Sequence, residues 1–122
     1  MRAVTVSLSS SPAWDALSAQ IESLGIALTS VQTEADFNLL VGRLGRPPIV
    51  VYNPEGTHEA LQVLEWARRH PVRLRVLVLV ERSDFAQYHE CMHLGTTAYD
   101  EVSAEPKRIA KILQLAGEGG TD

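Results

Sequence analysis

The chain has 122 residues, of which 45% are hydrophobic and 21% are charged, a composition typical of one globular domain. The formal net charge of −4 argues against a domain that binds nucleic acid alone, because neutralising phosphates requires clustered lysine and arginine. A single cysteine, Cys91, excludes an internal disulfide and a zinc site built from several cysteines. The sequence shows neither a signal-peptide pattern nor an apolar stretch of membrane-spanning length, so we expect a cytoplasmic protein.

The first unit of the chain is a predicted strand followed by a predicted helix. Residues 3–8 (AVTVSL) are rich in β-branched side chains and predict the strand. Ser11 and Pro12 then predict a helix start, since serine caps helices and proline is tolerated at the first helical position. The apolar stripe of this helix is expected at Trp14, Leu17, Ile21 and Leu24. Gly25 is expected to end the helix, and Trp14 is expected in the core.

The next stretch repeats this alternation. Residues 26–31 predict a second strand, and Thr33 with Asp36 three positions later resembles a helix-capping box. The apolar stripe of the second helix is expected at Phe37, Leu40, Val41 and Leu44. Residues 45–48 (GRPP) end that helix, and residues 49–52 form a continuous apolar run that is typical of a strand buried on both faces.

The third and fourth units follow a strong turn signal at residues 53–56 (NPEG). Thr57 can cap a third helix, in which Trp66 is expected to be partly exposed as a contact residue. The inner stripe of that helix is expected at Ala60, Leu61, Leu64 and Ala67. Residues 74–80 (LRVLVLV) predict the most apolar strand, and residues 83–84 can begin a helix that carries Phe85, Tyr88, Cys91 and Met92.

The last unit begins after Gly95, where the fourth helix is expected to end. Residues 96–102 predict a fifth strand, and a final helix is expected to begin near Ser103 and Pro106. The apolar stripe of this helix is expected at Ile109, Ile112, Leu113 and Ala116. Residues 117–122 (GEGGTD) have the composition of a flexible tail or the stub of a linker.

Five strand–helix units in series predict parallel strands with right-handed crossovers. At this length the pattern favours an α/β fold of the flavodoxin-like class. This is a doubly wound sheet of five parallel strands in the order 2-1-3-4-5, with five helices. We expect a single domain over residues 1–116.

The stretch from the fourth strand to the fifth carries a combination of motifs. The apolar run VLVLVE at 76–81 precedes Cys91, which lies four positions before Gly95, and residues 95–99 read GTTAY. This combination resembles the receiver domain of two-component response regulators, the CheY-like family. Receivers have an apolar fourth strand, a small residue four positions before a glycine, and a Gly-Ala-x-x-Tyr type of strand. The resemblance covers roughly residues 1–116 and implies a domain of signal transduction.

The resemblance also implies a phosphorylation site, and its residues are changed in this sequence. Receivers bind Mg²⁺ through two acidic residues after strand 1 and an aspartate after strand 3, and this aspartate is also the nucleophile that accepts the phosphoryl group. A lysine after strand 5 neutralises the charge of that group. In this sequence Ser9 and Ser10 follow strand 1, and Asn53 takes the place of the aspartate at strand 3. Val80, with Glu81 beside it, takes the place of a threonine or serine at strand 4, and Val102 takes the place of the lysine at strand 5. An amide cannot form an acyl phosphate, so we expect a degenerate pseudo-receiver that is not an enzyme and holds no metal or cofactor.

The function that the resemblance then implies is phosphorylation-independent contact with a protein. Receivers dimerise or dock partners through the face formed by helix 4, strand 5 and helix 5. The candidate residues on that face are Tyr88, His89, Met92 and Tyr99. The resemblance places Tyr99 where receivers carry an aromatic residue that couples the phosphorylation pocket to this face. The alternative is that Tyr99 is an ordinary half-buried aromatic side chain of the strand. We expect this face to bind a partner protein, a fused effector domain or a second copy of the chain. We do not expect the domain alone to bind nucleic acid, nor do we expect it to bind a membrane.

Two other functions are compatible with the sequence. A doubly wound sheet binds small ligands at the carboxyl ends of its strands, where Ser9, Ser10, Asn53, Glu81 and Ser103 would gather. Residues 89–93 (HECMH) match the H-E-x-x-H zinc motif, with Glu90 as the general base. The motif has no third ligand downstream, so a zinc hydrolase is the least favoured function. Cys91 is more simply a small buried hydrophobe.

A local basic cluster precedes the fourth strand. It consists of Arg68, Arg69, His70, Arg73 and Arg75. Such a cluster is either a solvated face or a patch for an anionic partner.

Overall fold

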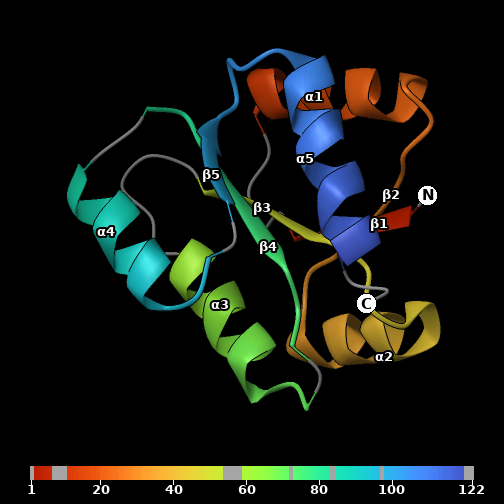
Figure 1. Cartoon of the computed structure of the whole chain (residues 1–122), viewed down its shortest axis with the longest axis vertical. Helices are drawn as coiled ribbons and strands as arrows, with labels where there is room; N and C mark the ends of the chain where they lie inside the picture. Colours follow the sequence, from red (N-terminus) through yellow and green to blue (C-terminus); the bar gives the residue numbers. More distant parts are fainter. Residues whose placement is uncertain are drawn as a thin grey trace.

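A computed structural model describes residues 2–6, 11–53, 59–71, 73–82, 85–96 and 98–119 of the chain. Its sheet contains the strands β1 (Arg2–Val6), β2 (Ala27–Val31), β3 (Ile49–Asn53), β4 (Val76–Val80) and β5 (Ala98–Glu101). All neighbouring strands pair in parallel, in the order β2-β1-β3-β4-β5. The prediction of a doubly wound flavodoxin-like sheet is therefore confirmed (Figure 1).

Five helices cover the two faces of this sheet (Figure 1). They are α1 (Pro12–Ser23), α2 (Glu34–Leu44), α3 (Glu59–Arg69), α4 (Phe85–His93) and α5 (Pro106–Gly119). The buried residues of α1 and α5 form one apolar layer, and those of α2, α3 and α4 form the other. Within the described part of the chain, no helix combines the length and the apolar character needed to cross a membrane.

Local side-chain chemistry positions the helix ends. Ser11 and Thr33 cap α1 and α2 as predicted, each accepting a hydrogen bond from the main-chain N–H three residues later, at 3.1 Å and 3.2 Å. Gly25 follows α1 with a φ of 93°, a conformation that a side chain would strain. The predicted caps at Thr57 and at residues 83–84 lie outside the described residues.

The two central strands lie entirely in the core. Every residue of β3 and of β4 is buried, as their continuous apolar runs predicted. Alternate side chains point to opposite layers. Val51 and Val78 pack beneath α2, α3 and α4, whereas Val50 and Leu77 pack beneath α1 and α5.

Two apolar side chains differ from their predicted exposure. Trp66 is only 6% exposed and packs against Phe37, with ring centroids 5.8 Å apart, so the prediction of partial exposure was wrong. The buried stripe of α3 includes Val63 as well as Trp66, which turns the indole towards the sheet. Leu24 is 39% exposed rather than buried, because α1 ends one residue before it.

Two predicted boundaries also moved. The expected fifth strand extended from residue 96 to residue 102, but β5 ends at Glu101 and Val102 lies in the following turn. Helix α5 continues to Gly119, three residues beyond the expected end of the domain at residue 116. Glycine lowers helix stability by about 1 kcal/mol per residue, a cost that weakens a helix without ending it.

Candidate functional site

Asn53 ends β3 at the carboxyl edge of the sheet, where the resemblance places a phosphoacceptor. Its side chain is 1% exposed, and its Oδ1 accepts a hydrogen bond from the main-chain N–H of Ala60 at 2.9 Å. Ala60 lies in the first turn of α3, whose N–H groups have no partners within the helix. Asn53 therefore acts as a cap for α3, supplied by the neighbouring strand.

Tyr52 is a residue of this edge that the sequence analysis missed. Its ring is fully buried and lies parallel to the ring of Trp14, with centroids 5.8 Å apart. Its hydroxyl donates a hydrogen bond to Oε1 of Glu81, the residue directly after β4. Burial raises the pKa of the Tyr52 hydroxyl, the hydrogen bond to Glu81 raises it further, and a hydrogen bond with Ser11 acts in the opposite direction. The available signal was a hydroxyl inside an apolar run, which must find a polar partner.

The other positions of the expected phosphorylation site are apolar or outside the described residues. Val80 is 2% exposed and Val102 is 9% exposed, and each packs into an apolar layer. Ser9 and Ser10 lie outside the described residues, and Ser103 is exposed. Buried valines thus occupy the two positions where the resemblance predicts a hydroxyl and a lysine.

The described residues of this edge do not fit the Mg²⁺ site of a receiver. Mg²⁺ prefers carboxylate oxygens, whereas the side chain of Asn53 is an amide that already accepts a hydrogen bond. The Glu81 carboxylate accepts a hydrogen bond from Tyr52. Among the residues that the structure describes, no group of three or more His, Cys, Asp or Glu side chains is placed to hold a metal ion.

Helix α4 presents an apolar stripe to solvent. Phe85 is 83% exposed, Tyr88 is 42% exposed and Met92 is 40% exposed, and His89 is exposed beside them. Their spacing of i, i+3, i+4 and i+7 places all four side chains on one face of the helix. The rings of Phe85 and His89 are stacked, with centroids 6.3 Å apart. Three of the predicted interaction residues therefore share one surface.

Tyr99, the fourth predicted interaction residue, connects β5 to α4. Its half-buried ring meets Tyr88 edge to face at a centroid distance of 5.3 Å. Its hydroxyl donates a hydrogen bond to Oε1 of Gln87 at 3.1 Å. Tyr99 is thus both a strand aromatic packed in the core and a direct neighbour of the exposed stripe.

The HECMH segment divides between solvent and core. His89 and His93 are exposed on α4, which ends at His93, whereas Cys91 between them is fully buried as predicted. Burial raises the pKa of the Cys91 thiol, the charge of Glu90 raises it further, and a hydrogen bond with Thr96 acts in the opposite direction. The thiol is therefore a core side chain rather than a reactive nucleophile.

An ion pair joins β5 to α5 and was also missed from the sequence. The Arg108 guanidinium lies 2.8 Å from the Asp100 carboxylate, whose side chain is 9% exposed. Because Asp100 and Tyr99 point to opposite sides of β5, this strand is tied to α5 on one side and to α4 on the other.

Comparison with known proteins identifies the fold. No family model and no curated protein matches the sequence. The structure is similar to the signal receiver domain of a modulated diguanylate cyclase from Desulfovibrio desulfuricans, with a TM-score of 0.73 and 13% identity over 98% of this chain and 95% of that chain. It is equally similar to the beryllofluoride-activated NtrC4 receiver domain dimer, with a TM-score of 0.73 and 16% identity over 98% of both chains.

A third similar structure is an atypical orphan response regulator reported to have a phosphorylation-independent regulatory mechanism. The TM-score is 0.68, with 15% identity over 95% of this chain and 94% of that chain. At these identities the similarity establishes a shared fold, and the chain has the CheY-like fold of receiver domains.

Proposed function

We propose that this chain is a receiver-type signalling module that works without phosphorylation and binds a protein through α4, β5 and α5. The observation that carries the proposal is the exposed stripe of Phe85, Tyr88, His89 and Met92 on α4. We further propose that it acts in the cytoplasm, as a binding module rather than an enzyme.

The carboxyl edge supports the part of the proposal that concerns phosphorylation. Asn53 is buried and occupied in capping α3, and an amide cannot accept a phosphoryl group as a carboxylate does. Val80 and Val102 offer no group that could neutralise a phosphate. These positions therefore supply neither a nucleophile for the phosphoryl group nor a positive charge to neutralise it.

The composition of the stripe supports the part that concerns binding. Aromatic residues and methionine are enriched at protein interfaces, and a few such side chains carry most of the binding energy. Covering an exposed phenylalanine contributes about 2 to 3 kcal/mol of apolar burial. Because Phe85 is 83% exposed, most of this gain is available to a partner.

The packing of Tyr99 supports a link between the stripe and the sheet. A partner that covers Tyr88 would restrict the ring that Tyr99 touches at 5.3 Å. Tyr99 is also held by Gln87, so β5 and α4 share two contacts at this point. Binding on the stripe would therefore restrain β5 directly.

The partner to test first is a second copy of the chain, since the similar NtrC4 receiver is described as a dimer. Sedimentation velocity over a range of concentrations should show self-association that Met92→Lys abolishes. Leu39→Lys is the matched control, because Leu39 is 65% exposed on α2, away from the stripe. Self-association lost equally in both variants, or absent at every concentration, would contradict a homodimer formed through α4.

A further inference from the structure

Arginines gather at the amino edge of the sheet, where the strands begin, opposite the edge that holds Asn53. The chain has eleven Lys and Arg residues. Seven of them lie where a strand begins or a helix ends at this edge: Arg2, Arg43, Arg46, Arg68, Arg69, Arg73 and Arg75. All seven are exposed, and none is lysine. We call this set the arginine edge.

Backbone hydrogen bonds hold three segments of the arginine edge side by side. The N–H of Val4 donates to the carbonyl of Pro48 at 3.0 Å, and the N–H of Ile49 donates to the carbonyl of Arg75 at 2.9 Å. Arg2 and Arg46 each lie two residues before one of these bonded residues. Because paired strands are about 4.8 Å apart, the starts of β1, β3 and β4 bring these arginines onto one narrow surface.

Ion pairs within the described part of the chain involve only some of these arginines. Arg69 pairs with Glu34 at 2.8 Å, and Arg68 lies 3.9 Å from Glu65. Within the described residues, no carboxylate lies at ion-pair distance from Arg2, Arg43, Arg46 or Arg73.

The helix dipole explains only some of the arginine edge. It favours a cation in the last turn of a helix, which accounts for Arg43 in α2 and for Arg68 and Arg69 in α3. Arg46 and Arg73 lie outside helices, so the dipole does not account for them. Their repulsion is an unfavourable contribution to folding that an anionic partner would reverse.

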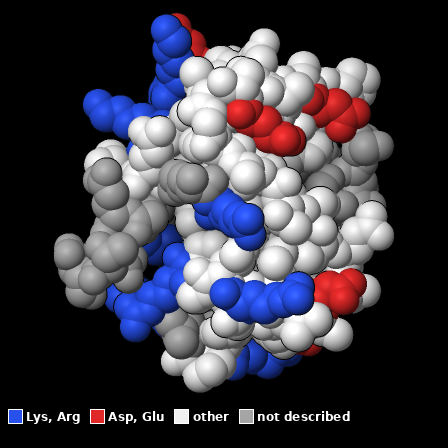
Figure 2. Space-filling view, turned by 90° about the vertical axis from the view of Figure 1, so that its right-hand side faces the viewer, with Lys and Arg blue, Asp and Glu red and all other residues white. Residues whose placement is uncertain are grey.

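The charge distribution is uneven across the molecule. Figure 2 views the chain from the side on which β1 begins and α2 ends, and Lys and Arg side chains spread over the lower half of this face and also project at its upper left. The Asp and Glu side chains visible there lie mainly in its upper part and at its right margin. A chain with a net charge of −4 thus carries a locally positive surface.

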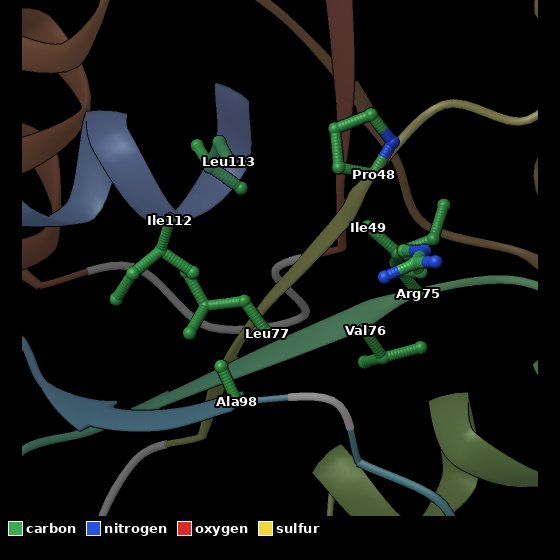
Figure 3. Close-up of a pocket in the computed structure, with 8 residues that line it drawn as sticks. All are labelled: Pro48, Ile49, Arg75, Val76, Leu77, Ala98, Ile112 and Leu113. Atoms are coloured by element: carbon green, nitrogen blue, oxygen red, sulfur yellow. The ribbon is translucent and has the colours of Figure 1, made fainter. Parts of the chain in front are cut away.

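An apolar recess adjoins the arginine edge (Figure 3). Its apolar lining includes Pro48, Ile49, Leu77, Ala98, Ile112 and Leu113. Arg75 is the charged residue in its wall, beside Pro48 and Ile49. Its free volume is about 10 Å³, room for about one water molecule, so it admits no side chain of a partner and leaves the arginines as the feature that a ligand can contact.

We propose that the arginine edge docks an acidic segment of a partner protein. Guanidinium groups bind carboxylates through paired hydrogen bonds, which suits an acidic peptide. Single-stranded nucleic acid is disfavoured by the net charge and by the position of the aromatics. Among the described residues, the exposed large aromatics Phe85 and Tyr88 both lie on α4, so none is available at this edge to stack a base.

Fluorescence anisotropy can test this proposal with a labelled peptide of the repeating unit Glu-Glu-Leu. The peptide should bind the native chain, with an affinity that falls as salt is added. A Gln-Gln-Leu peptide of equal length should bind much more weakly, because it has no carboxylate for the guanidinium groups to bind. Arg46→Glu with Arg73→Glu should weaken binding about tenfold or more, which corresponds to about 1.4 kcal/mol.

The matched control is Arg82→Glu with Lys107→Glu, which makes the same change in net charge at exposed positions of the opposite edge. This variant should bind the Glu-Glu-Leu peptide within about twofold of the native chain. Equal losses in the two double variants, or no binding at low salt, would overturn the proposal. Tighter binding of a single-stranded DNA oligonucleotide than of the peptide would overturn it as well, and would indicate a nucleic-acid surface.

Discussion

Helices α3 and α4 lie on the same face of the sheet, yet they bury very different amounts of side chain. Helix α3 buries Ala60, Val63, Leu64 and Trp66, whereas α4 buries Cys91 alone. The larger apolar side chains of α4, from Phe85 to Met92, are exposed instead. Because exposed apolar side chains add little to folding, the contrast indicates that α3 contributes more to the stability of the fold than α4 does, which is consistent with the contact role proposed for α4.

The largest effect should separate these helices directly. Trp66→Ala removes an indole that is 94% buried against Phe37, and it should lower the free energy of unfolding by about 3 to 5 kcal/mol. Phe85→Ala removes a ring that is 83% exposed, so it should change the free energy of unfolding by less than about 0.5 kcal/mol. Urea titration followed by circular dichroism measures both, and similar losses in the two variants would contradict the division of roles.

The next effect concerns the start of α3. Asn53→Ala removes the acceptor for the Ala60 N–H and should lower the free energy of unfolding by about 1 to 3 kcal/mol. Asn53→Asp keeps an oxygen at the same position and adds a charge that the helix N-terminus favours, so its loss should be much smaller. If both variants lost stability equally, the role of Asn53 as a cap would be wrong.

A smaller effect should appear in the pH dependence of stability. The pKa of Tyr52 is raised above its ordinary value of 10.0, so the folded state holds its proton more tightly than the unfolded state does. The stabilisation is therefore complete below pH 10 and is lost as the pH rises through the folded-state pKa. In Tyr52→Phe the free energy of unfolding should fall less steeply above pH 10 than it does in the native chain. At neutral pH it should be lower by about 1 kcal/mol, because the hydrogen bond to Glu81 is lost. An unchanged alkaline slope would show that Tyr52 does not contribute.

The smallest effect on stability should come with a large effect on binding. Met92→Lys changes a side chain that is 40% exposed, so its free energy of unfolding should stay within about 0.5 kcal/mol of the native value. The same substitution places a charge in the proposed interface and should abolish self-association in sedimentation velocity. A variant that loses stability and association together would not distinguish a contact role from a folding role.

Much of the fold was predictable because local signals agreed with one another. The continuous apolar runs of β3 and β4 indicated buried central strands, and Ser11 and Thr33 marked two helix starts. The burial of Trp66 was not predictable from spacing alone, since its neighbour Ala67 fits a helical stripe equally well.

The site was predictable only as a set of substitutions. The sequence placed Asn53 and Val80 at the expected positions, and the structure adds that one caps α3 and the other fills the core. The hydrogen bond between Tyr52 and Glu81 joins residues 29 positions apart, one in β3 and the other directly after the neighbouring strand β4. The arginine edge likewise depends on the sheet order, which brings Arg2 next to residues far along the chain. Local sequence showed only the part of the arginine edge between residues 68 and 75, and it gave no sign of the hydrogen bond between Tyr52 and Glu81.

The central claim is that the chain signals by contact and does not accept a phosphoryl group at Asn53. The most direct test is the intact mass of the native chain after incubation with acetyl phosphate and Mg²⁺, beside a receiver domain that has its aspartate. The account predicts an unchanged mass for this chain and a gain of one phosphate for the control. A gain of one phosphate on this chain that hydroxylamine removes would reveal an acyl phosphate and contradict the account.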